Sequence, residues 1–224
     1  MSVHFFHTTD NKRFAHLAVA ILLMIMLHPL VESGGTEGLV ADFLFLIVFL
    51  MGISAAQTGK RHFVIAIVLG CLATIGRIQG RTGVNLGDTL LFEVVAILFF
   101  AHVTWFVGWH IWSRRQQVDH EVLYAAICLY LVIGFLWSHI YLLMQMIDPA
   151  SFHSDSASNL SRADFIYFSY TTLTTVGYGD ILPSSRFARS FSIVEALSGQ
   201  LYIAILIARL VSATKMPKDP RSTR

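Results

Sequence analysis

Long apolar blocks separated by short polar loops are the feature that most limits how this chain can fold. Hydrophobic residues make up 55% of its 224 residues and charged residues only 13%, well below the roughly one quarter that soluble domains carry. A helix needs about 20 mostly apolar residues to cross the hydrocarbon core of a bilayer. The sequence therefore predicts an all-α integral membrane protein with six spanning helices, at 14–31, 38–57, 62–76, 88–112, 122–147 and 187–212.

Basic residues in the short loops predict which side of the membrane each loop occupies. If the spans alternate in direction, most of these residues fall on one side, which we expect to be cytoplasmic; they are Lys12, Arg13, Lys60, Arg61, Arg114, Arg115 and Lys215. Arg77 and Arg81 are exceptions on the other side. We therefore expect a multi-pass protein of the plasma (inner) membrane, with cytoplasmic ends at 1–13 and 215–224 and no sensing domain after Lys215.

A seventh apolar stretch, 165–176, is too short to cross a bilayer and leads directly into Thr175-Val176-Gly177-Tyr178-Gly179-Asp180. The pattern predicts a short re-entrant helix, capped by Asn159 or Ser161 with Asp164 in its first turn, followed by an extended segment. The glycines permit backbone angles that turn consecutive carbonyls to one side. A ring of such carbonyls can replace the water around a dehydrated cation.

The sequence Thr-Val-Gly-Tyr-Gly resembles the selectivity filter of potassium channels. The resemblance covers about 122–214 and extends beyond the filter, since Asp180, Pro183 and Gly199 also match the pore domain of the six-transmembrane potassium channel family. It implies an outer helix, a pore helix, a filter and an inner helix, assembled as a homotetramer around a central pore. K⁺ would be coordinated at Thr175, Val176, Gly177 and Tyr178, with Gly179 completing the filter.

Other residues take supporting roles under this resemblance. We expect Thr174, Asp180, Tyr167 and Glu195 to support the filter, although Glu195 could instead contribute to the ion pathway. Gly199 would be a hinge in the inner helix. The residues that could form a hydrophobic gate below it, or simply pack, are Ile203, Ile207 and Val211.

The four predicted helices at 14–112 resemble a voltage-sensor domain without its charges. The fourth, at 88–112, contains no Arg or Lys, whereas a voltage sensor needs charges that move in the field. We therefore expect a voltage-independent channel. Because the linker at 113–121 is short, the four-helix unit is expected to pack on the pore of its own subunit. Within that unit, Glu93 could pair with Arg77 or Arg81.

The function expected from these features is passive, potassium-selective conduction. The partners are K⁺ and the lipid bilayer, with no nucleic acid and no cofactor other than the bound K⁺ ions. Two alternatives remain: a weakly selective cation channel, and a non-conducting or tightly closed sensor or scaffold of channel shape. An enzyme is not expected, because the sequence has no catalytic constellation.

Overall fold

The computed structural model describes residues 13–31, 45–50, 60–79, 86–113, 120–155 and 159–214. Nearly all of these residues are helical, and residues 45–50 form a further helical turn. The elements are α1 (Arg13–Val31), α3 (Lys60–Gln79), α4 (Leu86–Ser113), α5 (His120–Ile147), β1 (Phe152–Ser154), α6 (Arg162–Leu173), β2 (Ile181–Pro183) and α7 (Arg186–Thr214).

Within the part of the chain that the structure describes, three helices are long and apolar enough to cross a membrane, namely Leu90–Ser113, His120–Ile147 and Arg186–Ser212. They correspond to the fourth, fifth and sixth predicted spans. The first and third predicted spans are helices, but their apolar parts, 14–27 and 62–75, are shorter. Of the predicted span 38–57, only 45–50 lies within the described residues. The protein is thus a helical membrane protein, and the six-span arrangement stays a prediction.

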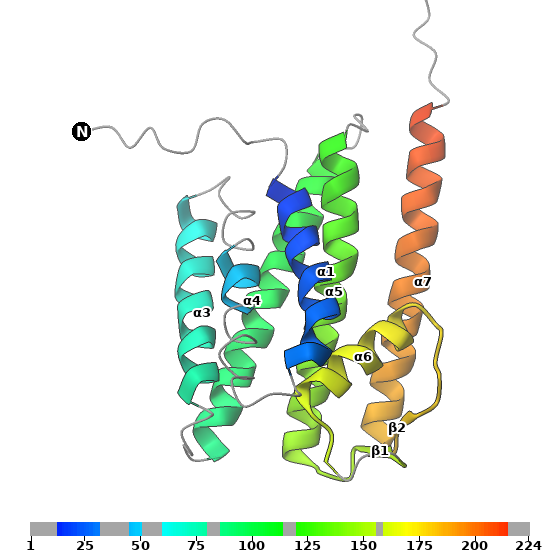
Figure 1. Ribbon diagram of the computed structural model, residues 1–224. Coiled ribbons are helices and arrows are strands. Elements are labelled where there is room, and N and C mark those ends of the chain that lie inside the picture. The colour runs from blue at the N-terminus through cyan, green and yellow to red at the C-terminus, as the bar shows by residue number, and fades with distance from the viewer. Residues whose placement is uncertain are drawn as a thin grey trace, which may run out of the picture.

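The helices form a bundle in which α4 packs between α3 and α5, and α1 also packs on α5 (Figure 1). Within the single chain, α1 and α4 therefore both pack on α5. Their shared core is aromatic: Phe49 meets Phe99 edge to face, with ring centroids 4.6 Å apart. Phe100 stacks on Phe135 of α5 at 5.6 Å. Such pairs fill an apolar interior with defined geometry.

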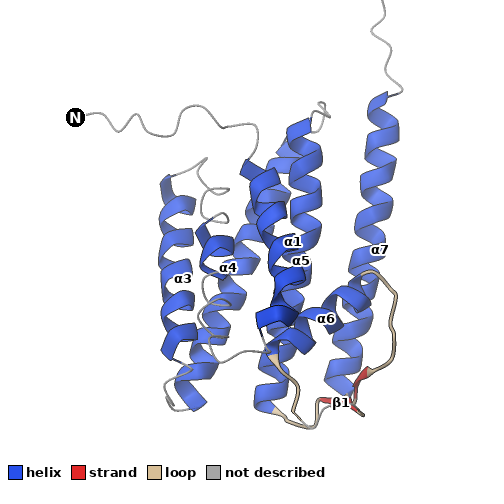
Figure 2. Ribbon diagram, viewed as in Figure 1, coloured by secondary structure: helices blue, strands red, loops and turns tan. Residues whose placement is uncertain are grey.

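The chain between α5 and α7 enters and leaves the bundle at the same end. α6 has 12 residues, about 18 Å of helix, which is too short to cross. From its end, residues 174–180 return along α7 to β2 (Figure 2). There β2 pairs antiparallel with β1, with Phe152 opposite Pro183. The predicted re-entrant helix and extended segment are present, while this two-stranded pairing was not predicted.

α7 lies away from α1 and α3, with α6 lying between it and α5 (Figure 1). α1 begins and α7 ends at the same end of the bundle, opposite β1 and β2 (Figure 1). A second apolar cluster, built around Tyr141, Phe152, Phe165 and Phe168, fastens α6 to α5 at the strand end.

Candidate functional site: the re-entrant loop

The N-terminal end of α6 is fixed by a capping box. The backbone N–H of Asp164 donates to Ser161 Oγ at 3.3 Å, and the Ser161 N–H donates to Asp164 Oδ2 at 2.7 Å. Two of the unpaired N–H groups at the helix start are thereby satisfied. Of the two predicted caps, Ser161 is confirmed, and Asp164 lies in the first turn as expected.

Residues 174–180, here called the re-entrant loop, have an unusual backbone. Every second residue has a positive φ: 60° at Thr175, 55° at Gly177 and 83° at Gly179. Glycine adopts this region without strain, but at Thr175 it costs on the order of 1–3 kcal/mol. The alternation replaces the regular pleat of a strand, so that consecutive carbonyls can face one side. Gly177 and Gly179 have the positive φ that the sequence analysis expects of them, and Thr175 has a positive φ as well.

Hydrogen bonds hold the start of the loop against the last turn of α6. The N–H of Thr174 donates to Tyr170 O at 3.1 Å, and that of Gly177 donates to Thr171 O at 3.1 Å. Thr174 Oγ1 donates to the same Tyr170 oxygen at 2.6 Å. The strained Thr175 is held from two sides, by its N–H donating to Thr172 O at 2.9 Å and by Gln200 Nε2 of α7, which donates to its hydroxyl at 3.2 Å.

Two stacked tyrosines support the second half of the loop. The rings of Tyr167 and Tyr178 stack with centroids 6.1 Å apart and planes 3° apart. The Asp180 carboxylate is close enough to interact electrostatically with the Tyr167 hydroxyl. In the single chain, Val176 and Tyr178 remain 53% and 72% exposed and border a hollow of about 510 Å³ between the loop and α6. The structure thus brings together Tyr167, Tyr178 and Asp180.

Glu195 joins three helices behind the loop. It is fully buried in α7, where Tyr141 of α5 donates to its Oε2 at 2.5 Å and Ser169 of α6 donates to its Oε1 at 2.5 Å. Ser169 also lies 2.7 Å from Gly134 O. Both carboxylate oxygens are therefore occupied by protein donors, which favours the structural role over a role in the ion path. The sequence did not single out Tyr141 and Ser169.

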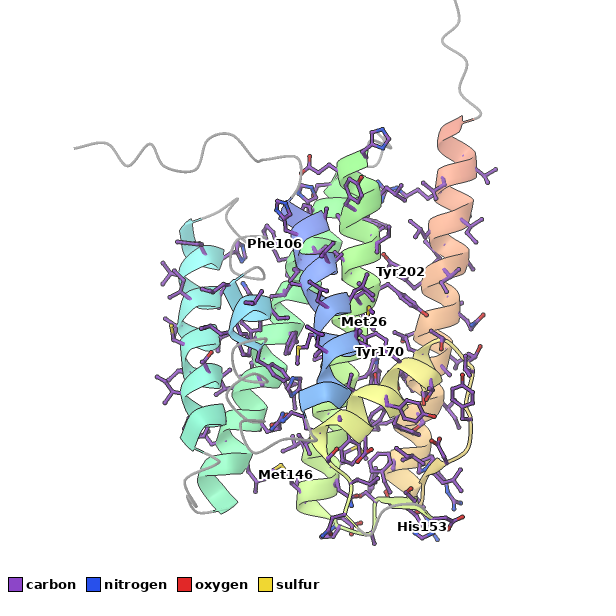
Figure 3. All side chains as sticks on the ribbon, in the orientation of Figure 1. Met26, Phe106, Met146, His153, Tyr170 and Tyr202 are labelled. Carbon is purple, nitrogen blue, oxygen red and sulfur yellow. The ribbon has the colours of Figure 1, made fainter. Side chains whose placement is uncertain are left out.

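Tyrosine side chains fill the space between α5 and the helices that carry the loop. Tyr170 of α6 donates to Leu131 O at 2.6 Å. Its ring lies so close to Gly134 that a Cβ there would come within 2.5 Å of it. Tyr202 reaches from α7 toward α5 (Figure 3) and donates to Ala126 O at 2.7 Å. These bonds hold α6 and α7 at fixed distances from α5.

The predicted hinge and gate residues lie on α7, which is helical without interruption from Arg186 to Thr214. Gly199 is buried at the end of α6. Ile203, Ile207 and Val211 follow it at one-turn spacing and are 39%, 55% and 48% exposed. On the same stretch of α7, Arg209 Nη2 donates to Ile111 O near the C-terminal end of α4, at 2.8 Å, where a cation suits the helix dipole.

Comparison with known proteins assigns this arrangement to a family. A family model described as "Ion channel" matches residues 125–215, which include most of α5 and all of α6, the re-entrant loop and α7. The chain is also 30% identical over 133 residues to Protein LctB of Bacillus caldotenax, covering 55% of this chain and 95% of LctB. The chain belongs to this ion channel family. The protein is therefore a channel and not an enzyme.

Plant relatives of this channel match it over a smaller region. Two pore potassium channel c of Oryza sativa subsp. japonica is 41% identical over 85 residues, 34% of this chain. Two-pore potassium channel 1 of Arabidopsis thaliana is 36% identical over 83 residues, 37% of this chain. The channel spans only 19% and 20% of the length of these two proteins. No solved structure matches it.

Proposed function

We propose that this channel conducts potassium ions selectively and passively across a membrane, with the re-entrant loop as its selectivity filter. The observation that carries the proposal is the positive φ at Thr175, Gly177 and Gly179, in a loop of the sequence Thr-Val-Gly-Tyr-Gly. The backbone carbonyls from Thr175 to Tyr178, with the Thr175 hydroxyl, would supply the oxygens that replace the hydration shell of K⁺. The plant relatives are named as potassium channels, which supports this choice of ion.

Conduction requires copies of the loop around an axis, and we propose a homotetramer. Its support is the surface that one chain leaves uncovered. The loop is exposed from Thr174 to Asp180, and so is an apolar surface along α7 that includes Phe187, Ile193, Val194, Leu197 and Leu201. The hollow beside Tyr178 gives a neighbouring chain a place to pack behind the loop. Four filters together would enclose the watery path that non-helical backbone needs at membrane depth.

α6 contributes to the electrostatics of this path. Its C-terminal end, at Leu173, leads into the loop, so the negative end of the helix dipole favours a cation at the inner mouth of the filter. At its other end, Asp164 suits the positive end of the dipole. The remaining parts of the proposal are a hydrophobic gate at Ile203, Ile207 and Val211, voltage independence, and cytoplasmic ends in the plasma (inner) membrane.

Ion flux from liposomes tests the proposal. The purified chain is reconstituted with a K⁺ gradient, and flux of K⁺ and of Na⁺ is followed over a range of voltages and pH, with and without barium. The proposal predicts a barium-sensitive K⁺ flux that excludes Na⁺. Equal fluxes of the two ions would indicate a weakly selective cation channel, and no flux under any condition would favour a non-conducting scaffold.

A further inference from the structure

A buried ionic cluster connects α4 and α5 with the start of α6. Arg162 Nη2 lies 2.9 Å from Glu93 Oε2, and Arg162 Nη1 lies 3.0 Å from Glu93 Oε1. The two contacts form the paired geometry in which guanidinium and carboxylate bind most specifically. Glu93 Oε1 also hydrogen-bonds Nδ1 of His139. Each residue comes from a different helix: Glu93 from α4, His139 from α5 and Arg162 from α6.

The surroundings of the cluster make these contacts strong. Glu93 and His139 are each only 3% exposed. The His139 ring stacks on Phe100 at 5.0 Å and meets Phe45 edge to face at 6.0 Å. A carboxylate in such an apolar setting must be paired, and ionisable residues within a membrane span are functional candidates by default. Arg162, whose side chain is 28% exposed, is the partner at the edge of the cluster.

Helix stability does not account for a cation at this position. Arg162 is the first residue of α6, where the positive end of the helix dipole disfavours a positive charge. The same end already has its capping box of Ser161 and Asp164. The charge of Arg162 is therefore directed toward Glu93 and not toward its own helix.

The position of Arg162 connects the ionic cluster mechanically to the filter. α6 is a single rigid helix with Arg162 at one end and the re-entrant loop directly after the other. Ser169 and Tyr170 fasten its second half to α5 and α7. Arg162 fastens its first turn to α4. A shift of α4 would thus be passed through α6 to the residues that start the filter.

We propose that Glu93 and His139 position the pore helix through Arg162, so that the N-terminal helices act on selectivity at the filter. The inference rests on the proposed function. Apolar residues of similar volume often stabilise a fold as well as a buried ion pair does. The ion pair, unlike apolar packing, fixes an orientation. Its two contacts hold the first turn of α6 at a defined angle to α4.

A second ionic contact between the same helices supplies a matched control. His110 Nε2 of α4 lies 3.3 Å from Glu121 Oε1 of α5, and both side chains are 10% exposed. This pair joins α4 and α5 at their other ends and lies far along both helices from α6. Glu121→Gln therefore removes a comparable buried charge between the same two helices without touching the pore helix.

The test compares Glu93→Gln, Arg162→Gln, their double variant and Glu121→Gln as full chains in liposomes. We expect Glu93→Gln and Arg162→Gln each to lower the ratio of K⁺ to Na⁺ flux roughly tenfold, a change of about 1.4 kcal/mol. The double variant should be no worse than either, because both remove the same contact. Glu121→Gln should keep the wild-type ratio. An unchanged ratio in Glu93→Gln, or an equal fall in Glu121→Gln, would overturn the inference.

A second measurement, of thermal stability, serves for variants that assemble too poorly for flux assays. K⁺ bound in the filter should raise the thermal midpoint of the assembled protein relative to Na⁺. Arg162→Lys, which keeps the charge but loses the paired geometry, should reduce this K⁺-specific shift; a shift equal to that of the wild type would refute the positioning role. A wild type that shows neither K⁺ flux nor a K⁺-specific shift contradicts the proposed function itself.

Discussion

Gly199 of α7 lies directly against the carbonyl oxygen of Leu173, the last residue of α6. A Cβ atom on residue 199 would be 2.2 Å from that oxygen and 3.0 Å from Leu173 Cδ1, and the first distance is far inside van der Waals contact. The absence of a side chain therefore sets how closely α7 approaches the end of α6. This close packing is a reason for glycine that is independent of the expected hinge.

Gly199→Ala should force α7 away from α6 and lower the stability of the assembled protein, by about 1–3 kcal/mol. Leu173→Ala should not rescue it, because the clash is with backbone. Thermal unfolding in detergent measures the effect. Gly108→Ala in α4 is the control, since its Cβ would make an ordinary 3.8 Å contact with Leu129. Unchanged stability with altered opening in Gly199→Ala would mean that the residue acts as a hinge alone.

Tyr141→Phe should destabilise the protein by about 1–3 kcal/mol, because it leaves Oε2 of the buried Glu195 without its donor. Ser169→Ala removes the donor to Oε1. We expect the effects of the two substitutions to be non-additive, since both act on one carboxylate. Tyr124→Phe, on the exposed side of the same helix, should have no effect. If Tyr141→Phe also leaves the thermal unfolding midpoint unchanged, the hydrogen bond from Tyr141 to Glu195 does not contribute to stability.

Gly177→Ala should abolish K⁺-selective flux. The positive φ of 55° is strained for any residue with a Cβ, yet such a Cβ would meet nothing within 4 Å. The loss should therefore come from backbone strain, about 1–2 kcal/mol, and not from a clash. Val176→Ala, at a neighbour without a positive φ, should retain more K⁺ flux. Equal flux in both variants would show that the alternating backbone is not what binds the ion.

The open probability of the channel should depend little on voltage. α4 carries no Lys or Arg between Leu86 and Ser113, and each charge that crosses the field contributes about 2.3 kcal/mol per 100 mV. Current–voltage curves from planar bilayers measure this directly. A steep, sigmoidal voltage dependence would require gating charges in another part of the chain and would contradict the prediction.

Local signals in the sequence predicted the parts of the site that depend on neighbours along the chain. The sequence offered Asn159 or Ser161 as the cap of α6, with Asp164 in its first turn, and the structure selects Ser161. The need for Gly177 and Gly179 likewise follows from backbone preference alone. The positive φ of Thr175 does not, because it is held by Thr172 and by Gln200, which lies 25 residues away.

The sequence could not predict the contacts between distant helices. Glu93 was expected to pair with Arg77 or Arg81, whose side chains lie outside the described residues. Its partners in the structure are His139 and Arg162, 46 and 69 residues further along the chain. Such a pairing depends on how α4, α5 and α6 pack, and no spacing along the chain encodes it. The same holds for Tyr141 and Ser169 around Glu195.

The reversal potential under bi-ionic conditions tests the central claim most directly. The reconstituted protein is placed in a planar bilayer with K⁺ on one side and Na⁺ on the other. A filter at Thr175 to Gly179 predicts a reversal potential displaced strongly in the direction set by K⁺, and loss of that displacement in Gly177→Ala. A reversal potential near zero in the wild type, with current flowing, would contradict potassium selectivity.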